Sequence, residues 1–594
     1  MAQQTPKGGE FLLTPTQTEQ FFTPETLTDE QRSLGEMCRK FIEDEVYAEH
    51  DHAIENQENN ISATLLKKAG ELGLLMVEIP EAYGGLGMDK ATATIISENS
   101  VRQGSFGVTC MCHTGIGTLP ILYFGNEAQK QKYLPKLASG EFIGAYALTE
   151  AGSGSDALGA KTKAVLSADG KHYILNGEKM WITNSAWADV FTVFAKVDGE
   201  HFTGFIVDRD TPGFGMGAEE KKMGIKGSST CALTFQDAKV PVENVLGEIG
   251  KGHKIAFNIL NVGRWKLGAA CLGGCKWVLR ESIKYAKERQ QFKQPIANFG
   301  LIRKKIADVG IRTYFTESMV YRIAGLYDAA IARIPADAPD HESRVLACIE
   351  EYNIEASIAK VYGSEALWFA ADEGVQVLGG YGFSAEYPME RVQRDCRINR
   401  IFEGTNEINR LLVPGTLLKR AMKGEVDLMG AIQRLMTELK DGIARNGDGP
   451  LAQEIDIANF AKKLAVYASG VAVQKYMQTI QNEQLIMEAM ANLTIEAFAI
   501  DSGVARALAL LKEHGEDKCQ PVLAMVKTYA NEKYIELLTI ARGLLANIAG
   551  GDAEVYGRYQ KALSRFDIFI PVATNPLRET VAAALIEKEA YSLL

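Results

Sequence analysis

The spacing of hydrophobic residues changes twice along this chain, and this change limits the fold more than any other feature. Between residues 142 and 250, hydrophobic residues alternate with polar ones, as at 172–177, 190–195 and 231–235, with Gly, Asp and Pro between the runs. Such alternation is typical of β-strands. Before and after this region, hydrophobic residues recur at intervals of three and four, which indicates amphipathic helices. The sequence therefore predicts a multidomain α protein with a central β domain.

The same pattern predicts five segments, since 594 residues are too many for a single hydrophobic core. They are an N-terminal arm at 1–27, an N-terminal helical domain at 28–141, a β-sandwich or barrel-like middle domain at 142–250, a helical bundle at 251–424, and an additional C-terminal helical domain at 425–594. The helical domain begins with a capping-box pattern from Thr28 to Gln31. The polar, Pro/Thr-rich arm is expected to be a tail and not a packed element.

Composition excludes several functions. A net charge of −11 argues against nucleic-acid binding, which requires clustered Lys and Arg. No apolar run reaches the length of a spanning helix, and the first residues lack a signal-peptide pattern, so we expect a cytoplasmic protein. The nine cysteines are expected to be reduced thiols. Cys110 and Cys112 lie beside His113, but without a second pair at ligand spacing we predict no metal.

Glu403 is the candidate catalytic base. It follows the apolar Ile401 and Phe402 and precedes Gly404 and Thr405, so it should lose hydration when a substrate binds. Desolvation raises a carboxyl pKa, and a raised pKa suits a base that removes a weakly acidic proton next to a carbonyl. Taken alone, this pattern is also that of an ordinary glutamate at the start of a helix.

Two further segments could hold a flat ring or a pyrophosphate. Residues 146–156 lead from a strand into a Gly/Ser loop whose backbone N–H groups can bind anions, although such loops are most often simple turns. Trp181 and Thr183 lie two residues apart, hence on one face of a strand, where they could cover and bond a ring. A tryptophan in a β core is the alternative.

Together with four other segments, these patterns resemble the acyl-CoA dehydrogenase family, in unbroken order over about residues 30–420. The four segments are 226–235, 289–292, 376–383 and 400–410. The sequence at 298–302 and the additional helical domain at 425–594 look most like the very-long-chain branch of this family. The resemblance implies a flavoprotein of fatty acid β-oxidation that uses FAD to convert acyl-CoA into trans-2-enoyl-CoA and passes electrons to an electron-transfer flavoprotein.

The resemblance also implies residue roles. Glu403 falls on the family's base, and glycine occupies position 263, where other members carry the base. The expected substrate-side residues are Ser155, Asn261, Gly263, Arg264, Phe402 and Gly404. The expected FAD contacts are Tyr146, Leu148, Thr149, Gly154, Ser155, Trp181, Ile182, Thr183, Arg289, Phe292, Gln376, Val377, Gly379, Gly380, Thr405 and Glu407. Arg289, Phe292 and the 376–380 group would reach FAD from a neighbouring subunit, so a homodimer is expected.

Small residues at Val108, Cys112, Gly115 and Gly117 stand where medium-chain members close the pocket floor, which suggests medium to long acyl groups. Three alternatives stay open. An acyl-CoA oxidase would use oxygen as acceptor, and a flavoprotein scaffold would retain only vestigial activity. The stretch 455–480 could also be an interfacial helix that holds the protein at the inner membrane surface, or a helix packed on its neighbours.

Overall fold

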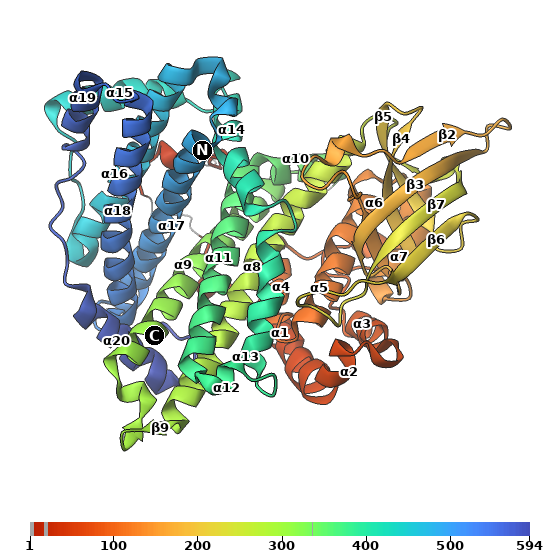
Figure 1. Ribbon diagram of the computed structural model, residues 1–594, viewed down its shortest axis with the longest axis horizontal. Helices are drawn as coiled ribbons and strands as arrows, with labels where there is room; N and C mark the ends of the chain where they lie inside the picture. The colour runs from red at the N-terminus through yellow and green to blue at the C-terminus, as the bar shows by residue number, and fades with distance from the viewer. Residues whose placement is uncertain (1–4, 17–21, 336) are drawn as a thin grey trace.

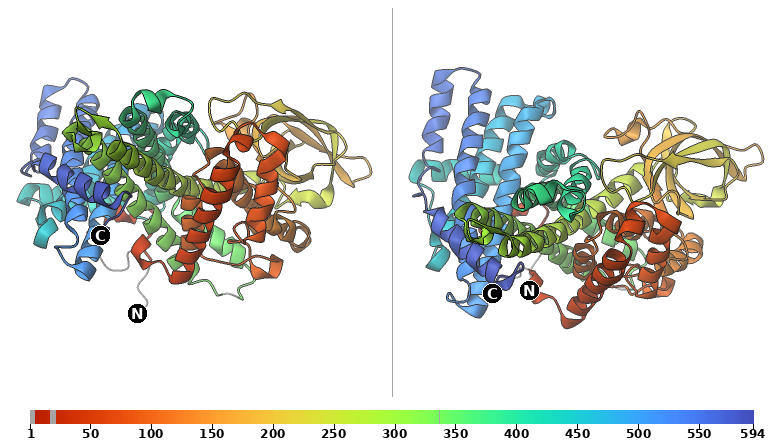
Figure 2. Two further views of the ribbon diagram at one scale, coloured as in Figure 1. Left: turned by 90° about the horizontal axis from the view of Figure 1, so that it is seen from below. Right: turned by 60° about the horizontal axis from the view of Figure 1, so that its bottom comes forward.

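The computed structural model describes residues 5–16, 22–335 and 337–594, and it confirms the predicted fold class. The β domain lies at one end of the molecule above the N-terminal helices, long helices form the centre, and the C-terminal helices lie at the opposite end (Figure 1). The views in Figure 2 show the same order of parts.

The N-terminal helices form the floor beneath the β domain. They are α1 Asp29–Lys40, α2 Asp51–Glu55, α3 Ile61–Glu71, α4 Lys90–Asn99, α5 Gly104–Cys112, α6 Leu119–Phe124 and α7 Glu127–Ser139. The predicted capping box is present, since Thr28 and Gln31 each bond the other's backbone N–H. The segment 104–124 is long and apolar enough to cross a membrane, but 72% of it is buried inside this domain. This segment, which contains α5 and α6, is therefore part of the hydrophobic core.

A single eight-stranded sheet makes up the middle domain. Its strands are β1 Gly144–Ala147, β2 Lys163–Leu166, β3 His172–Thr183, β4 Val190–Val197, β5 His201–Asp208, β6 Phe214–Glu219, β7 Thr230–Pro241 and β8 Val245–Leu246. The order is β6-β7-β3-β2-β4-β5-β8, and β1 pairs in parallel with β4. The register of β3 against β7 shifts between Lys179 and Ile182. This irregularity turns Trp181 outward, as described below.

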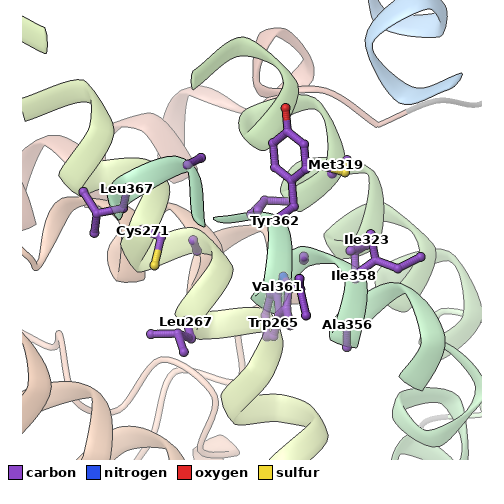
Figure 3. Packing of buried hydrophobic residues seen from close by; sticks show 14 of the residues in the cluster. Trp265, Leu267, Cys271, Met319, Ile323, Ala356, Ile358, Val361, Tyr362 and Leu367 are labelled. Carbon is purple, nitrogen blue, oxygen red and sulfur yellow. The ribbon is translucent and has the colours of Figure 1, made fainter. Parts of the chain in front are cut away.

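Long helices form the centre of the molecule. They are α8 Gly252–Glu288, α9 Gly300–Ile331, α10 His341–Glu351, α11 Asn353–Leu378, α12 Gly380–Phe383, α13 Pro388–Asp395 and α14 Asn406–Met422, with a small hairpin of β9 Gln290–Gln291 and β10 Gln294–Pro295 after α8. Buried side chains of α8, α9 and α11 interleave, among them Trp265, Met319 and Val361 (Figure 3). At 1.5 Å per residue, the 37-residue α8 spans about 55 Å.

The C-terminal helices pack directly on this bundle. They are α15 Leu428–Asp441, α16 Ala452–Tyr476, α17 Gln484–His514, α18 Gln520–Ala549, α19 Ala553–Leu563 and α20 Thr574–Lys588. Gly503 of α17 lies against the ring of Phe315 of α9, and α20 also runs along α9. The stretch 455–480 lies mostly within α16, where Lys462 is buried and paired with Asp501 at 2.7 Å. Most of this stretch is therefore packed on its neighbours.

The prediction that the arm is an unpacked tail is wrong for residues 7–16, which we call the N-terminal strap; residues 1–4 and 17–21 lie outside the described part. Phe11 and Leu12 are each only 5% exposed, and the ring of Phe11 lies 4.7 Å from that of Phe498. The backbone N–H groups of Gly8 and Gly9 donate to the carboxylates of Glu351 and Glu355. Phe11 and Leu12 are only two buried hydrophobic residues in a polar segment, too few to form a periodic pattern that would predict packing.

Candidate active site

Glu403 lies in the turn that precedes α14. Its Oε2 atom is buried and has no hydrogen-bond partner among the residues that the structure describes, although Glu403 as a whole is only partly buried. Desolvation raises the pKa of this carboxyl to about 7, against the opposing charges of Arg264 and Lys360. Glu403 lies two residues before the N-cap of α14, and the first-turn acid of that helix is Glu407. The alternative of an ordinary helix-start glutamate therefore does not describe Glu403.

The substrate-side residues of α8 face this carboxylate. A Cβ placed on Gly263 would come within 2.5 Å of Oε2 of Glu403. Arg264 is buried, donates from Nε to the carbonyl of Glu403 at 3.3 Å, and donates from Nη1 to Oδ1 of Asn261 at 2.8 Å. Burial lowers the pKa of Arg264, but a guanidinium stays charged. Asn261 thus orients Arg264, and Arg264 fixes the turn.

The turn itself has two consecutive left-handed residues, Glu403 at φ 57° and Gly404 at φ 77°. Glycine adopts this conformation freely and glutamate does not, so the surroundings must hold Glu403 in place. Nδ2 of Asn409 donates to the carbonyls of Gly404 at 2.8 Å and Thr405 at 3.0 Å. Thr405 caps α14 by accepting from the backbone N–H of Ile408 at 3.2 Å.

The Gly/Ser loop after β1 is fixed at its start and open at its tip. Glu150 is paired with the buried Lys179 at 2.7 Å, and Lys179 also donates to the carbonyl of Leu148 at 3.2 Å. A Cβ on Gly152 or Gly154 would meet no atom within 4 Å. This open, backbone-lined tip fits a pyrophosphate or a ring edge.

Three other residues predicted at this loop occupy different positions. Tyr146 is buried, and its hydroxyl donates to the carbonyl of Ala256 at 3.4 Å. The carbonyl of Thr149 accepts from the N–H of Met180, which ties the loop to β3. Ser155 is exposed at the tip, where its hydroxyl can reach a ligand.

The β3 segment presents an indole to the outside. Trp181 is 53% exposed and has φ 60°, in the irregular part of the strand. Ile182 is 2% exposed, so its side chain belongs to the core and only its backbone can reach a ligand. Burial raises the pKa of the Cys112 thiol to about 12, the charge of Glu403 adds to this rise, and Thr183 opposes it, so β3, α5 and the turn that carries Glu403 meet at one place.

The remaining predicted cofactor residues form a second group at the far end of α8. Arg289, Val377, Gly379 and Gly380 line an open pocket of about 510 Å³. Phe292 is 87% exposed on the adjacent hairpin, and Gln376 is exposed on α11. The structure thus brings the predicted residues together as two groups and not one.

The distance along α8 separates these groups. Arg289 lies 26 residues beyond Gly263, or about 39 Å at the rise of an α-helix. The two groups of predicted cofactor residues therefore lie at different parts of α8 within one chain.

Phe402 and Gly404 lie partly buried in the turn, whereas Glu407 is exposed on α14. Sequence reasoning missed Lys360 and Asn409, which bond the turn. A lysine inside the apolar helical text at 354–362 was the signal that could have revealed the first of them.

Among the described residues, no group of three His, Cys, Asp or Glu is placed to hold a metal ion. Both ring nitrogens of His113 are bonded to backbone groups. Nε2 bonds the carbonyl of Leu137, and Nδ1 accepts from the N–H of Gly144. Burial lowers the pKa of His113 to about 4, so it is a neutral structural residue.

Comparison with known proteins agrees with this geometry. Family models described as the acyl-CoA dehydrogenase N-terminal, middle and C-terminal domains match residues 28–141, 145–238 and 250–418, and a further acyl-CoA dehydrogenase C-terminal model matches 460–556. A probable acyl-CoA dehydrogenase of Bacillus subtilis (strain 168) is 48% identical over 99% of this chain and 98% of its own length. The very long-chain specific acyl-CoA dehydrogenase of Homo sapiens mitochondria is 36% identical, over 84% of this chain and 78% of its own.

A solved structure extends the agreement to three dimensions. The crystal structure of the acyl-CoA dehydrogenase from Bacillus anthracis, complexed with FAD, superposes with a TM-score of 0.96 and 48% identity, covering 99% of this chain and all of that one. Four matched domains in order and relatives aligned over nearly the full length leave one conclusion: the chain belongs to the acyl-CoA dehydrogenase family.

Proposed function

We propose that this protein dehydrogenates medium- to long-chain acyl-CoA thioesters at the α and β carbons, with Glu403 as the base and an electron-transfer flavoprotein as the electron acceptor. One observation carries the proposal. The Glu403 carboxylate has a buried oxygen without any partner and a pKa of about 7, and it lies in contact with Gly263. An unpaired, desolvated carboxylate is ready to take a proton from a bound substrate.

FAD is the cofactor of this family, and the site fits it. The open tip at Gly152 and Gly154 and the half-exposed indole of Trp181 offer a backbone cradle and an apolar face. Bound FAD would accept the hydride from the β carbon. The chain's own residues exclude water, hold the thioester and remove the α proton through Glu403.

The length of the acyl chain is proposed from small residues on and just after α5. Val108 and Cys112 lie four residues apart on α5, hence on one helix face, and Gly115 follows in the π-helix His113–Gly117. Gly115 is buried, yet a Cβ there would meet no atom within 4 Å, so empty space lies beside it. Gly117 differs, because a Cβ there would strike the backbone of Gly144 at 2.7 Å. The first three residues, and not Gly117, support a deep acyl slot.

A homodimer is proposed from the two separate groups of cofactor residues. Since about 39 Å of α8 lies between Gly263 and Arg289, the Arg289 group would serve the FAD of a second copy. Sedimentation with FAD bound tests this: a monomer with full activity would contradict it.

We further propose that the protein works in the cytoplasm. Contact with a membrane surface through α16 would have to use residues other than Lys462, which is buried. Flotation with anionic vesicles tests the contact, and absence of the protein from the lipid fraction would remove it.

The reaction is tested by mixing the FAD-loaded protein anaerobically with acyl-CoA thioesters of increasing length while flavin absorbance is followed. The parent should bleach with medium and long chains, and Glu403→Gln should not. Glu355→Gln is the matched control, because Glu355 is also buried, has an unpartnered oxygen and has a pKa raised to about 7, but it bonds the N-terminal strap. Bleaching of Glu403→Gln at the parent's rate would overturn the assignment.

A further inference from the structure

A buried lysine lies beneath the catalytic turn. Lys360 belongs to α11, is 0% exposed, and sits in the sequence between the core residues Ile358 and Val361 shown in Figure 3. Its Nζ donates to the carbonyl of Gly404 at 2.8 Å and to Oδ1 of Asn406 at 2.6 Å. Both acceptors follow Glu403 within three residues. The ammonium group of Lys360 is therefore buried where it bonds the turn that carries Glu403.

The turn needs such a bond. Glu403 and Gly404 are both left-handed, and a glutamate in that conformation relaxes unless its neighbours hold it. The carbonyl of Gly404 accepts from two side chains, Lys360 and Asn409. Of these two donors only Lys360 carries a charge, and charge-assisted hydrogen bonds are the stronger kind.

Lys360 is itself held in position through its partner. Nδ2 of Asn406 donates to Ser364 and to Glu365, each at 3.1 Å. Glu365 accepts two bonds from Arg410, at 2.8 and 2.9 Å.

This chain of bonds continues into the C-terminal helices, because Nε of Arg410 donates to Oδ1 of Asn492 on α17 at 2.8 Å. The additional domain therefore shares a continuous polar network with the catalytic turn.

Several titratable groups surround the ammonium of Lys360, and Glu403 is one of them. Arg264 and Cys271 face it from α8, and Glu407 faces it from α14. Burial raises the pKa of Cys271 far above neutrality, so that thiol is uncharged, and Glu407 lies exposed to solvent. Burial lowers the pKa of Lys360 to about 8, so the ammonium is charged at neutral pH. Its attraction favours the ionised form of Glu403.

We propose that Lys360 is a positioning residue of this enzyme: it holds the left-handed Glu403–Gly404 turn through its bond to Gly404 and supplies a buried positive charge beside the base. The inference rests on the proposed role of Glu403. Within the described part of the chain, the ammonium of Lys360 bonds only Gly404 and Asn406, so its effect should fall on turnover and on the ionisation of the base, with substrate affinity unchanged.

The experiment compares Lys360→Met with Lys462→Met in the FAD-loaded protein. Lys462 is a matched control, because it is equally buried but is paired with Asp501 in the C-terminal domain. We measure kcat and KM from about pH 6 to 9 with a saturated acyl-CoA and an artificial acceptor. Lys360→Met should lose about tenfold or more in kcat, with KM within about twofold of the parent. The pH at half-maximal kcat should rise by about one unit.

Lys462→Met should lower thermal stability and leave the pH profile of kcat in place. A Lys360→Met profile that overlays the parent's, or an equal shift in Lys462→Met, would overturn the proposal. Should Lys360→Met fail to retain FAD, Lys360→Gln keeps a donor for Gly404 without the charge, and the same shift is required of it. Activity in Glu403→Gln at the parent's level would instead overturn the base assignment, whichever result Lys360 gives.

Discussion

The carboxylate of Glu403 occupies the space that a side chain at position 263 would need. Oε2 of Glu403 lies 2.5 Å from where a Cβ on Gly263 would stand. The two positions at which the resemblance to the family predicts a base therefore converge on one site. The Glu403 carboxylate can occupy this space only because residue 263 is a glycine and has no side chain.

Gly263→Ala should move this carboxylate and lower kcat by about tenfold to a hundredfold, because small misplacements of a reacting group are costly. Gly543→Ala is its control: it is also a helix glycine, in α18, and its Cβ would meet no atom within 4 Å. Stopped-flow reduction of the flavin measures both. Equal rates in the two variants would show that Gly263 is not part of the site.

The pH dependence of flavin reduction should follow Glu403. Its pKa of about 7 requires the rate constant to fall roughly tenfold per unit below that pH and to level off above it. Single-turnover reduction across this range gives the profile. A profile that is flat down to about pH 5, near the pKa of an ordinary carboxyl, would contradict a desolvated base.

The free energy of unfolding should also depend on the ionisation of Glu403, because the charged carboxylate is costly to bury. The folded state keeps the Glu403 proton up to about pH 7, whereas an unfolded carboxyl loses it near 4.5, so the parent loses stability as the pH rises between these values. Glu403→Gln has no charge to bury. It should be more stable than the parent by about 1–3 kcal/mol at pH 8 and equal to it below about pH 5. Thermal unfolding at both pH values measures the difference, and a less stable variant at pH 8 would disprove it.

Cys112→Leu should shorten the preferred acyl chain. Cys112 ends α5 close to Thr183 and Glu403, and the empty space at Gly115 lies three residues further on. A larger side chain would block the way to that space while leaving Glu403 intact. Activity profiles from four to twenty carbons, roughly the range of common fatty acyl groups, would show a shorter maximum. An unchanged maximum would place the acyl slot elsewhere.

Leu12→Ala should destabilise the protein by about 2–5 kcal/mol, the usual cost of removing a buried leucine side chain. Leu12 is 5% exposed in the N-terminal strap, whereas Leu485 is 81% exposed on α17 and serves as the matched control. Leu485→Ala should change stability by less than about 0.5 kcal/mol. Denaturant unfolding compares the two, and similar losses would show that the strap is not packed in solution.

The fold class was accessible from local patterns in the sequence, whereas the two groups of cofactor residues were predicted from the resemblance to the family. A spacing of two predicted the β domain, and Glu403 was recognisable by its apolar flanks and the following glycine. The strap was not, since its partners lie more than 340 positions away, as in the bond from Gly9 to Glu355. Lys360 was missed for the same reason: its role depends on Gly404, which only the packing of α11 against the turn brings near.

The N-terminal strap also constrains how the chain is made. Phe11 is synthesised roughly 490 residues before its partner Phe498, an interval of about 25 to 100 s at rates of about 5–20 residues per second. Until α17 has been made, the strap can reach only its partners in the central helices, such as Glu351 and Glu355. The strap therefore completes its packing late in synthesis, and two segments far apart in the sequence become ordered together.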